Sequence, residues 1–437
     1  MAKREIKIGI IGFGTVGASA VRIIRDNARK VETRAGAKIT VKYIADKDIT
    51  TERNVNIDKS VLTTDAMNLI NDPEIDIIVE LIGGVEPAHK FIIEALKKGK
   101  HVVTANKAVL AKYWEEVMDT ASENNVAIYL EASVGAGIPV IQSLHDGLAA
   151  NNIKSIYGIV NGTTNYMLTR MLEDKKDYDD VLKDAQKLGY AEADPSYDVD
   201  GMDAANKLVI LSSIAFDAVV DLKDVYVEGI SRLTRKDMID AKSLGYVIKL
   251  LAIAKDCGKG QYDVRVHPTL IPADHQMASI DDVYNGIFIV GDASGPILLY
   301  GQGAGGDAAA SAVVSDIIYI TRNIVNGVAG KVPSVFYEKG AEKAKIKNIE
   351  EIDFRYYLRF TVLDQAGMLA TIAGVLGKNG ISISSVVQKE QDEGHKVPVI
   401  ITTDKAKEKS MRAAIAEIDT MPSVKGKTLV IRIEKGE

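Results

Sequence analysis

Cysteine is almost absent from this chain of 437 residues, in which Cys257 is the single example. An intrachain disulfide is therefore impossible. We interpret Cys257 as an incidental thiol at a helix end and turn, because no activating base lies near it in the sequence. The six histidines include no pair with HxH or HxxxH spacing, so we expect no zinc site.

Long apolar runs and basic clusters are also missing. No apolar stretch free of charge approaches the length of about 18 residues that marks a membrane-spanning helix. The N-terminus enters a predicted strand without an apolar signal region, which favours a cytoplasmic location. The net charge is −6 and no Lys/Arg cluster stands out. We therefore expect neither a membrane nor a nucleic acid as a partner.

The composition that remains is typical of a globular protein, with 46% hydrophobic and 26% charged residues. The length predicts two to three domains with well-formed cores. Length and composition therefore do not indicate a function, and local motifs have to supply that evidence.

The first part of the chain alternates apolar strands with helices. Strands are predicted at 6–11, 39–45, 76–82, 102–105 and 126–130, and helices at 87–98 and 109–124. This alternation predicts an α/β fold with a doubly wound parallel sheet of the Rossmann type. The carboxyl ends of its strands would border the ligand crevice.

A glycine turn follows the first strand directly. Its residues are Gly12, Phe13, Gly14, Thr15, Val16 and Gly17. The first glycine permits the tight turn, the second lets a pyrophosphate approach the backbone, and the third lets the helix pack closely on the strand. The turn predicts a dinucleotide with its phosphates at the helix N-terminus. The alternative is a glycine-rich turn without a ligand.

The end of the second strand bears on the choice of dinucleotide. Asp46 stands there and can accept hydrogen bonds from the adenosine ribose of NAD. Lys47 and Arg53 lie nearby and can hold the 2′-phosphate of NADP instead. The choice between NAD and NADP stays open at this point.

Residues 134–300 have a less regular pattern, which predicts a mixed α+β domain. Helices are predicted at 138–150, 164–173, 178–188 and 202–216, and strands at 155–160 and 284–291. A glycine-rich stretch, 301–306, then opens a helix of small residues at 307–325.

A loop dense in carboxylates precedes the helix predicted at 202–216. Asp203 and Lys207 lie four residues apart in that helix and therefore share one face. Such a pair is usually a solvated ion pair. Here it leads into an apolar segment, which favours a lysine held at a cleft, where a carboxylate orients it and burial tunes its pKa.

This stretch resembles the signature of homoserine dehydrogenases. The matching residues are Ala185, Gly189, Tyr190, Ala191, Asp194, Pro195, Asp198, Gly201, Asp203 and Lys207. The resemblance implies NAD(P)-dependent hydride transfer between L-homoserine and L-aspartate 4-semialdehyde, in threonine and methionine biosynthesis. Lys207 would be the acid, Asp203 would orient it, and Lys107 would assist at the oxygen or carboxylate. Glu192 would hold the substrate ammonium, and Asp198 is a second candidate for substrate contact.

The resemblance also extends to the cofactor side. Lys107, at the end of a Thr-x-Asn-Lys motif, would contact both substrate and cofactor, and Gly83 lies in the neighbouring strand end. Gly305 matches a backbone position near the nicotinamide. Thr163 or Thr164 is expected to cap a helix or to contact substrate, with capping favoured.

A glycine-rich hinge resembles the monovalent cation site of the family. The ligands implied are the Glu131 carboxylate with the backbone carbonyls of Val134, Ala136 and Ile138. The ion would be Na+ or K+. The alternative is a hinge without an ion.

The last part of the chain has a different organisation. Residues 354–437 follow the order βαββαβ, which is ferredoxin-like, and resemble an ACT domain, although Ala366 replaces the usual proline. Such a sheet would leave one face free to pair with a second copy. An amino-acid effector, threonine above all, would bind where copies meet, near Gly367 and residues 379–384. A purely structural dimerising role is the alternative.

These patterns divide the chain into four parts. We expect an NAD(P)-binding Rossmann domain at 1–133 with 301–330, a catalytic and dimerisation domain at 134–300, a linker at 331–353 and an ACT domain at 354–437. The implied assembly is a homodimer or a larger homo-oligomer.

Two other functions are less well supported. Aspartate-semialdehyde dehydrogenase shares a substrate, but its acyl-enzyme needs a nucleophilic cysteine, and Cys257 lacks the setting for one. A sensor of nucleotides and amino acids without turnover would have no need of a proton donor such as Lys207.

Overall fold

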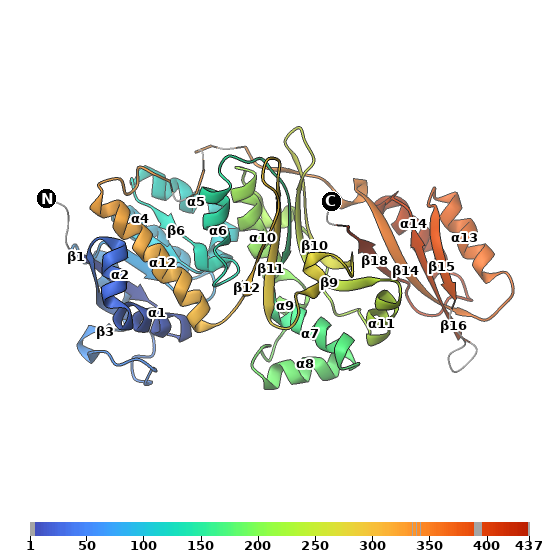
Figure 1. Cartoon of the computed structure of the whole chain (residues 1–437), viewed down its shortest axis with the longest axis horizontal. Coiled ribbons are helices and arrows are strands. Elements are labelled where there is room, and N and C mark those ends of the chain that lie inside the picture. The colour runs from blue at the N-terminus through green and yellow to red at the C-terminus, as the bar shows by residue number, and fades with distance from the viewer. Residues whose placement is uncertain (1–4, 334, 338, 341, 389–395, 436–437) are drawn as a thin grey trace.

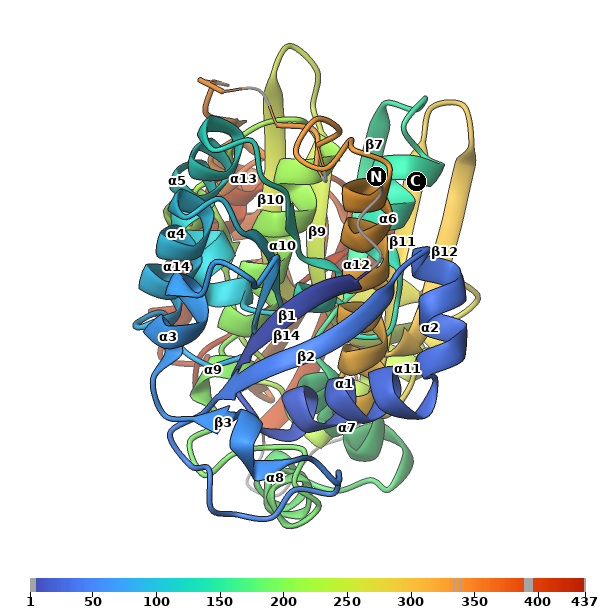
Figure 2. The same cartoon turned by 90° about the vertical axis from the view of Figure 1, so that its left-hand side faces the viewer.

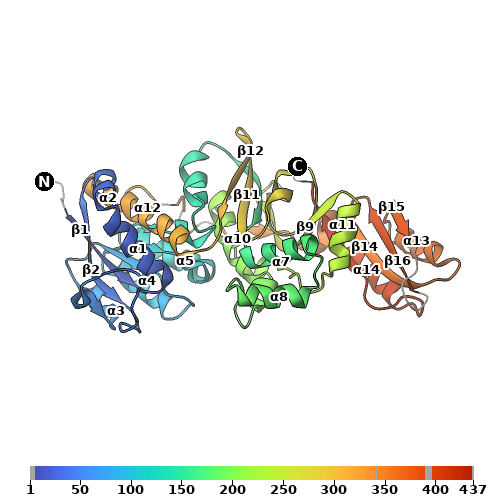
Figure 3. The same cartoon turned by 60° about the horizontal axis from the view of Figure 1, so that its bottom comes forward.

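The computed structural model describes residues 5–333, 335–337, 339–340, 342–388 and 396–435. Three units follow one another along the long axis of the molecule, from the N-terminal unit to the C-terminal one (Figure 1). The same succession is visible when the molecule is turned (Figure 3).

The first unit is built on a six-stranded sheet in the order β3-β2-β1-β4-β5-β6. All neighbouring strands are parallel. The strands are β1 (Glu5–Ile11), β2 (Lys38–Ala45), β3 (Leu62–Thr63), β4 (Ile77–Glu80), β5 (His101–Thr104) and β6 (Ile128–Tyr129). This order is that of the Rossmann fold, as predicted.

Helices cover both faces of this sheet because its strands are apolar on both sides. Ile77 and Val79 belong to one buried cluster and Ile78 to another. The helices are α1 (Thr15–Asp26), α2 (Ala28–Ala35), α3 (Ala66–Asn71), α4 (Ala88–Lys97) and α5 (Lys107–Glu123). A sixth helix, α12 (Gly306–Val325), returns from much later in the chain to lie beside α1 and α2 (Figure 2).

By length and composition, α12 is the one described helix that is apolar enough to cross a membrane. More than half of its apolar window, 56%, is buried inside the molecule. Val313 and Ile317 pack there against the core of the parallel sheet. These contacts are those of a core helix.

The second unit contributes antiparallel strands to a larger mixed sheet. These are β7 (Ile153–Ile159), β9 (Tyr246–Asp256), β10 (Gln261–Pro272), β11 (Tyr284–Gly291) and β12 (Gly295–Gln302), with the short β8 (Tyr226–Val227) beside β10. Its helices are α6 (Val140–Gln142), which continues into a π-helical turn at Ser143–Gly147, α7 (Gly162–Glu173), α8 (Tyr178–Lys187), α9 (Ser196–Val199), α10 (Met202–Ala215) and α11 (Arg235–Ser243).

Sequence patterns missed β9, β10, β12 and α11. Strand β9 is buried almost throughout, so its sequence lacks the alternation of apolar and polar residues that reveals a strand. The expected helix end at Cys257 was wrong for the same reason, because Cys257 lies in the hairpin turn between β9 and β10 and is exposed.

The third unit has the predicted βαββαβ order. Its elements are β14 (Asp353–Leu363), α13 (Met368–Lys378), β15 (Ile383–Gln388), β16 (Lys396–Thr403), α14 (Glu408–Asp419) and β18 (Leu429–Ile433), with the short β17 (Ala406–Lys407) between β16 and α14. Phe354, Leu358 and Phe360 on one face of β14 pack with Ile372 of α13 and Ile418 of α14.

The sheets of the second and third units form one continuous sheet. Its order is β12-β11-β7-β9-β10-β18-β14-β16-β15, and β18 pairs in parallel with β10. The expectation of a free face on the third unit was therefore wrong for its central strands. Helix α11 lies beside β14 (Figure 3). Tyr357 of β14 shares a buried cluster with Met238 of α11, and Arg359 forms an ion pair with Asp237 of the same helix.

The segment expected to be a linker, 331–353, packs on its neighbours. Strand β13 (Lys345–Ile346) pairs with β10, and Val335 is buried. The Tyr337 hydroxyl donates to Asp119 at 3.0 Å. The two effector-site groups proposed from sequence, Gly367 and residues 379–384, lie at opposite ends of α13. An 11-residue helix is roughly 16 Å long, so one copy of the chain cannot bring them together.

Candidate functional site

The glycine turn between β1 and α1 has the geometry of a phosphate cradle. Gly12 has φ +107°, and a Cβ there would lie 2.8 Å from the Leu81 carbonyl. A Cβ on Gly17 would lie 2.1 Å from the Gly12 oxygen, whereas a Cβ on Gly14 would meet nothing within 4 Å. The turn thus needs glycine at 12 and 17 for packing, while the backbone at Gly14 is open to a ligand.

A second helix begins beside this turn. A Cβ on Gly306, the first residue of α12, would lie 2.6 Å from Thr15 Cγ2. The Ser19 hydroxyl donates to Asp307 at 2.7 Å and so ties α1 to α12. The N-termini of α1 and α12 therefore converge. Their aligned N–H groups favour an anion there, which fits a dinucleotide pyrophosphate.

The end of β2 carries both types of group proposed for ribose recognition. The Asp46 carboxylate accepts the Phe13 and Asp48 backbone N–H groups. Arg53 donates its Nε to the Phe13 carbonyl at 2.8 Å. Lys47 is exposed. Asp46 and Arg53 thus hold the glycine turn in place through hydrogen bonds to the Phe13 backbone.

Two lysines approach opposite oxygens of one buried carboxylate. Lys107 Nζ lies 2.9 Å from Asp203 Oδ1, and Lys207 Nζ lies 2.7 Å from Asp203 Oδ2. Lys207 also donates to the Val160 carbonyl at 2.6 Å. The Asp203 and Lys207 side chains are 5% and 11% exposed, while that of Lys107 is 34% exposed. The cluster is thus open to solvent through Lys107.

Burial and mutual charge give the three groups different pKa shifts. Burial, together with the charge of Lys107, lowers the pKa of Lys207 despite the opposing effect of Asp203. Burial also acts to lower the pKa of Lys107, but Asp203 outweighs it and the net shift is upward. Burial would raise the pKa of Asp203, but the two lysines hold it below its usual range. Lys107 therefore stays charged, while Lys207 is the lysine that releases a proton more readily.

Asn161 connects a second carboxylate to this cluster. Its Nδ2 donates to Asp198 Oδ1 at 2.7 Å and to Asp203 Oδ2 at 2.9 Å. Burial raises the pKa of Asp198, and the charge of Asp203 adds to the shift. Sequence patterns did not single out Asn161, because an Asn before a helix is most often only a cap.

Asn161 is in fact also the cap of α7. Its Oδ1 accepts the Thr164 N–H at 2.8 Å, which corrects the expectation that Thr163 or Thr164 is the N-cap. Thr163 instead donates its hydroxyl to the Tyr190 carbonyl and ties α7 to the carboxylate-rich loop. The same Asn side chain therefore caps the start of α7 and holds two carboxylates.

Glu192 is not joined to the cluster. It lies in the loop between α8 and α9 and is exposed. Within the described part of the chain its carboxylate forms no hydrogen bond or ion pair, and its backbone carbonyl accepts from Gln186. The carboxylate is thus free to meet a ligand.

A polar network at the ends of β4 and β5 places Lys107. Asn106 caps α5 by accepting the Val109 N–H at 3.1 Å, and its Nδ2 donates to the Ile82 and Gly84 carbonyls. Lys107 follows as the first residue of α5. The loop after β4 is open at Gly83, where a Cβ would meet nothing within 4 Å.

Glu80 lies buried beneath this network. It accepts the Thr104 hydroxyl at 2.6 Å and the Ile82 N–H at 2.8 Å. Burial raises its pKa to about 7, because these hydrogen bonds offset only part of the desolvation of its charged form.

The glycine-rich hinge holds the buried carboxylate of Glu131, and the Ile138 carbonyl, one of the expected ligands, accepts the Val140 N–H at 2.8 Å. Glu131 accepts the Ile141 and Gln142 N–H groups, each at 2.9 Å, and burial raises its pKa to about 7. Val134 and Ala136 are buried, and no hydrogen bond to their carbonyl oxygens occurs among the described residues. No group of three or more His, Cys, Asp or Glu side chains in those residues forms a metal site. A weakly held monovalent cation bound mainly by carbonyls is compatible with this arrangement.

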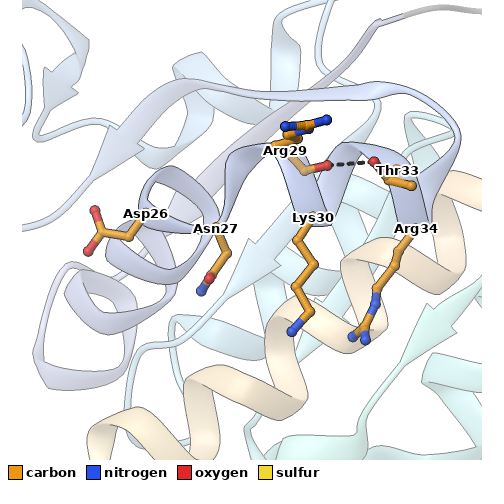
Figure 4. A pocket seen from close by; sticks show the side chains of 6 residues that line it. All are labelled: Asp26, Asn27, Arg29, Lys30, Thr33 and Arg34. Atoms are coloured by element: carbon orange, nitrogen blue, oxygen red, sulfur yellow. Dashed lines mark hydrogen bonds between the residues drawn. The ribbon is translucent and has the colours of Figure 1, made fainter.

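A hollow of about 500 Å³ lies on the outer surface, away from these groups. It is lined by Asp26, Asn27, Arg29, Lys30, Thr33 and Arg34 from α1 and α2 (Figure 4). All six lining residues are exposed, and they lie at the C-terminal end of α1 and on α2, whereas the glycine turn lies at the N-terminal end of α1. We do not assign it to the functional site.

Comparisons with known proteins match the same three regions. The homoserine dehydrogenase NAD-binding model matches residues 12–131, the homoserine dehydrogenase model matches residues 139–318, and the ACT domain model matches residues 356–420.

Full-length relatives agree with the family models. The chain is 41% identical to a homoserine dehydrogenase of Pseudomonas aeruginosa over 436 residues, which is 99% of each protein. It is 43% identical to that of Synechocystis sp. over 437 residues, 98% of this chain and 99% of the relative. A crystal structure of a homoserine dehydrogenase from Thiobacillus denitrificans matches with a TM-score of 0.92 at 42% identity and covers 99% of both chains.

Proposed function

The chain belongs to the homoserine dehydrogenase family, and from this premise we propose that the cluster of Lys107, Asp203 and Lys207 is its catalytic centre. The activity is the NAD(P)-dependent interconversion of L-homoserine and L-aspartate 4-semialdehyde. The observation that carries the assignment is the approach of two ammonium groups to one buried carboxylate, at 2.9 and 2.7 Å.

Lys207 moves the proton in this proposal. Its lowered pKa makes it the acid that protonates the aldehyde oxygen during reduction and the base that takes the hydroxyl proton during oxidation. Asp203 orients it from four residues away on the same helix. Lys107 stays cationic and stabilises the negative charge that develops on the oxygen.

The nicotinamide cofactor supplies and accepts the hydride. The open backbone at Gly14, the converging starts of α1 and α12, and Gly305 at the N-cap of α12 would hold it. Asp46 would accept the ribose hydroxyls of NAD, while Lys47 and Arg53 would serve the 2′-phosphate of NADP. Phe13, Thr15, Val16, Gly83 and Lys107 complete the proposed contacts.

Two carboxylates would hold the substrate. Glu192 is exposed with no competing side-chain partner in the described chain and would pair with the substrate ammonium. Asp198, bound to Asn161, faces the same cluster and would be a second contact. Asp203 and Lys107 would meet the reacting end.

A monovalent cation, Na+ or K+, would stabilise the hinge between the two halves of the active site. Glu131 and the carbonyls of Val134, Ala136 and Ile138 are its proposed ligands. Val134 and Ala136 offer buried carbonyls with no hydrogen bond in the described chain, and a cation beside Glu131 would favour its ionised form.

The proposed domain limits are 1–133 with 301–330, 134–300, 331–353 and 354–437, and the proposed location is the cytoplasm. The assembly is a homodimer or larger homo-oligomer. The ACT domain binds an amino acid, threonine above all, at a site that two copies of α13 and β15 share.

Absorbance of the reduced nicotinamide tests the catalytic assignment. L-Homoserine with NAD+ or NADP+ is expected to give steady turnover in the wild type. Lys207→Ala should lower kcat by about two to four orders of magnitude, the usual range for loss of a general acid. A near-normal kcat in a folded variant would remove Lys207 from the mechanism.

Glu192→Gln tests the substrate contact separately. It should raise KM for homoserine and leave KM for the cofactor nearly unchanged, because the ammonium is on the substrate alone. Equal changes in both constants would contradict the role.

A further inference from the structure

A short segment, residues 226–230, lies between the C-terminal domain and the back of the catalytic cluster. It begins in β8, which pairs in parallel with β10. The Glu228 N–H then donates to the Val266 carbonyl of β10 at 2.8 Å. The segment is therefore held against the central sheet, and a change in its position requires a change in what packs on it.

The C-terminal domain makes its ion pair with this segment through Arg432, and it also contacts the Tyr226 ring through Arg412 and through its hydrophobic core. Arg432 of β18 donates Nη1 to Glu228 Oε2 at 2.9 Å and Nη2 to the Tyr226 hydroxyl at 3.2 Å. Its Nε donates to Glu408 of α14 at 3.0 Å. The Arg432 side chain is 4% exposed, so solvent screens these interactions weakly. The guanidinium thus connects α14 and β18 to Glu228.

The other side of the segment touches the elements that carry the catalytic carboxylates. A Cβ on Gly229 would lie 2.3 Å from the Val199 carbonyl, and the Ile230 N–H donates to that carbonyl at 2.8 Å. A Cβ on Gly201, the N-cap of α10, would lie 3.1 Å from Val227 Cγ1. The packing leaves no room for a side chain at Gly229 and little at Gly201.

These contacts are adjacent to the catalytic cluster in the chain. Val199 directly follows Asp198, and Gly201 stands two residues before Asp203. A displacement of residues 226–230 would therefore reach Asp198 through backbone contacts with Val199, and Asp203 through the contact of the Val227 side chain with Gly201. Chains of packed contacts of this kind carry energetic coupling between separate sites.

We propose that Glu228 is a positioning residue for the dehydrogenase reaction: its ion pair with Arg432 holds residues 226–230 against α9 and α10 and thereby sets the positions of Asp198 and Asp203. This inference rests on the proposed function of these two carboxylates. It makes the C-terminal domain part of the support of the active site, whether or not an effector is bound.

Glu228→Gln in the full-length enzyme tests the proposal, with Glu434→Gln as the matched control. Glu434 follows β18 directly and pairs with Lys255 of β9 at 2.8 Å and with Arg265 of β10. It belongs to the same interface between the domains but has no contact with residues 226–230 among its ion pairs. Loss of interface stability alone therefore affects both variants.

We expect Glu228→Gln to raise KM for homoserine by about two- to thirtyfold, the range of coupling through packed networks. The acid limb of its kcat/KM profile for homoserine oxidation should move to lower pH. A displaced Asp203 stabilises the charged form of Lys207 less, and the pKa of Lys207 falls. KM for NAD+ should stay unchanged. Glu434→Gln should change neither KM for homoserine nor the acid limb, whatever its melting temperature.

Equal effects of the two variants, or no effect of Glu228→Gln on either readout, would overturn the proposal. If Glu228→Gln does not fold, Tyr226→Phe replaces it, since it removes only the hydroxyl that contacts Glu228 and Arg432. It should move both readouts in the same direction. Failure of the proposed function itself has a different signature, which is normal turnover of Lys207→Ala.

Discussion

Lys107 and Lys207 bind opposite oxygens of the same carboxylate, although they come from different units of the molecule. Lys107 begins α5 of the Rossmann unit, and Lys207 lies within α10 of the second unit. Asp203 between them is 3% exposed. The carboxylate therefore holds the two units together at the proposed catalytic centre. It also couples the protonation of the two lysines.

Removal of the Lys107 charge is expected to raise the pKa of Lys207. Lys107 disfavours the charged form of Lys207, and without it Asp203 acts on Lys207 alone. Lys107→Gln should therefore move the acid limb of kcat/KM for homoserine oxidation to higher pH by about one unit. Lys112→Gln, which removes an exposed lysine of the same helix, should leave the profile in place. If the acid limb of Lys107→Gln stays at the wild-type pH, the charge of Lys107 does not affect the pKa of Lys207.

Asp46→Ala is expected to weaken the binding of NAD+ more than that of NADP+, because only NAD+ presents a free 2′-hydroxyl at the end of β2. Asp46 also accepts the Phe13 N–H, so both cofactors will bind less well and the ratio of dissociation constants is the quantity to measure. A ratio equal to that of the wild type would exclude a ribose contact.

Lys47→Ala provides the converse test with little structural disturbance, since Lys47 is exposed. It should raise the dissociation constant of NADP+ by about fivefold, which is the factor that corresponds to ~1 kcal/mol from an exposed ion pair. Arg53 is less suitable alone because it also donates to the Phe13 carbonyl. If Lys47→Ala combined with Arg53→Ala leaves NADP+ binding intact, no phosphate site lies at this strand end.

Glu80→Gln is expected to remove part of the pH dependence of stability. The pKa of Glu80 is about 7 in the folded chain against 4.5 ordinarily. Its contribution is therefore fully present below pH 4.5 and is lost as the pH rises through 7. Relative to Glu80→Gln, the wild type should lose about 3 kcal/mol of unfolding free energy between pH 4.5 and pH 8.

Urea denaturation at a series of pH values measures this difference. Glu52→Gln, which alters an exposed carboxylate, serves as the control and should follow the wild type. Parallel pH curves for Glu80→Gln and the wild type would mean that Glu80 is ionised in the folded chain at neutral pH.

A point change is the suitable test of the effector proposal, because β10 would lose its partner β18 if the C-terminal domain were removed. Ser384 lies exposed on the edge strand β15. Ser384→Leu should abolish inhibition of homoserine oxidation by added L-threonine and leave turnover without threonine unchanged. Lys409→Leu, at an exposed position on α14, should keep the inhibition. Equal threonine sensitivity of both variants would place the effector elsewhere.

Much of this architecture follows from patterns within single elements. The glycine turn after β1, the Asp203–Lys207 spacing on α10 and the βαββαβ order of the C-terminal domain are local, and each has a period or spacing that one helix or strand imposes. Strand β9 escaped prediction because it is buried on both faces and carries no such period.

Only the tertiary structure decided the rest. Lys107 reaches Asp203 from another unit, and Asn161 joins two carboxylates that the sequence keeps apart from it. The pKa shifts arise from burial and from charges distant in the chain. The continuity of β10 with β18, which places Arg432 against Glu228, is likewise a long-range pairing. Local sequence encodes spacing along an element, whereas desolvation and contacts between elements depend on how the whole chain packs.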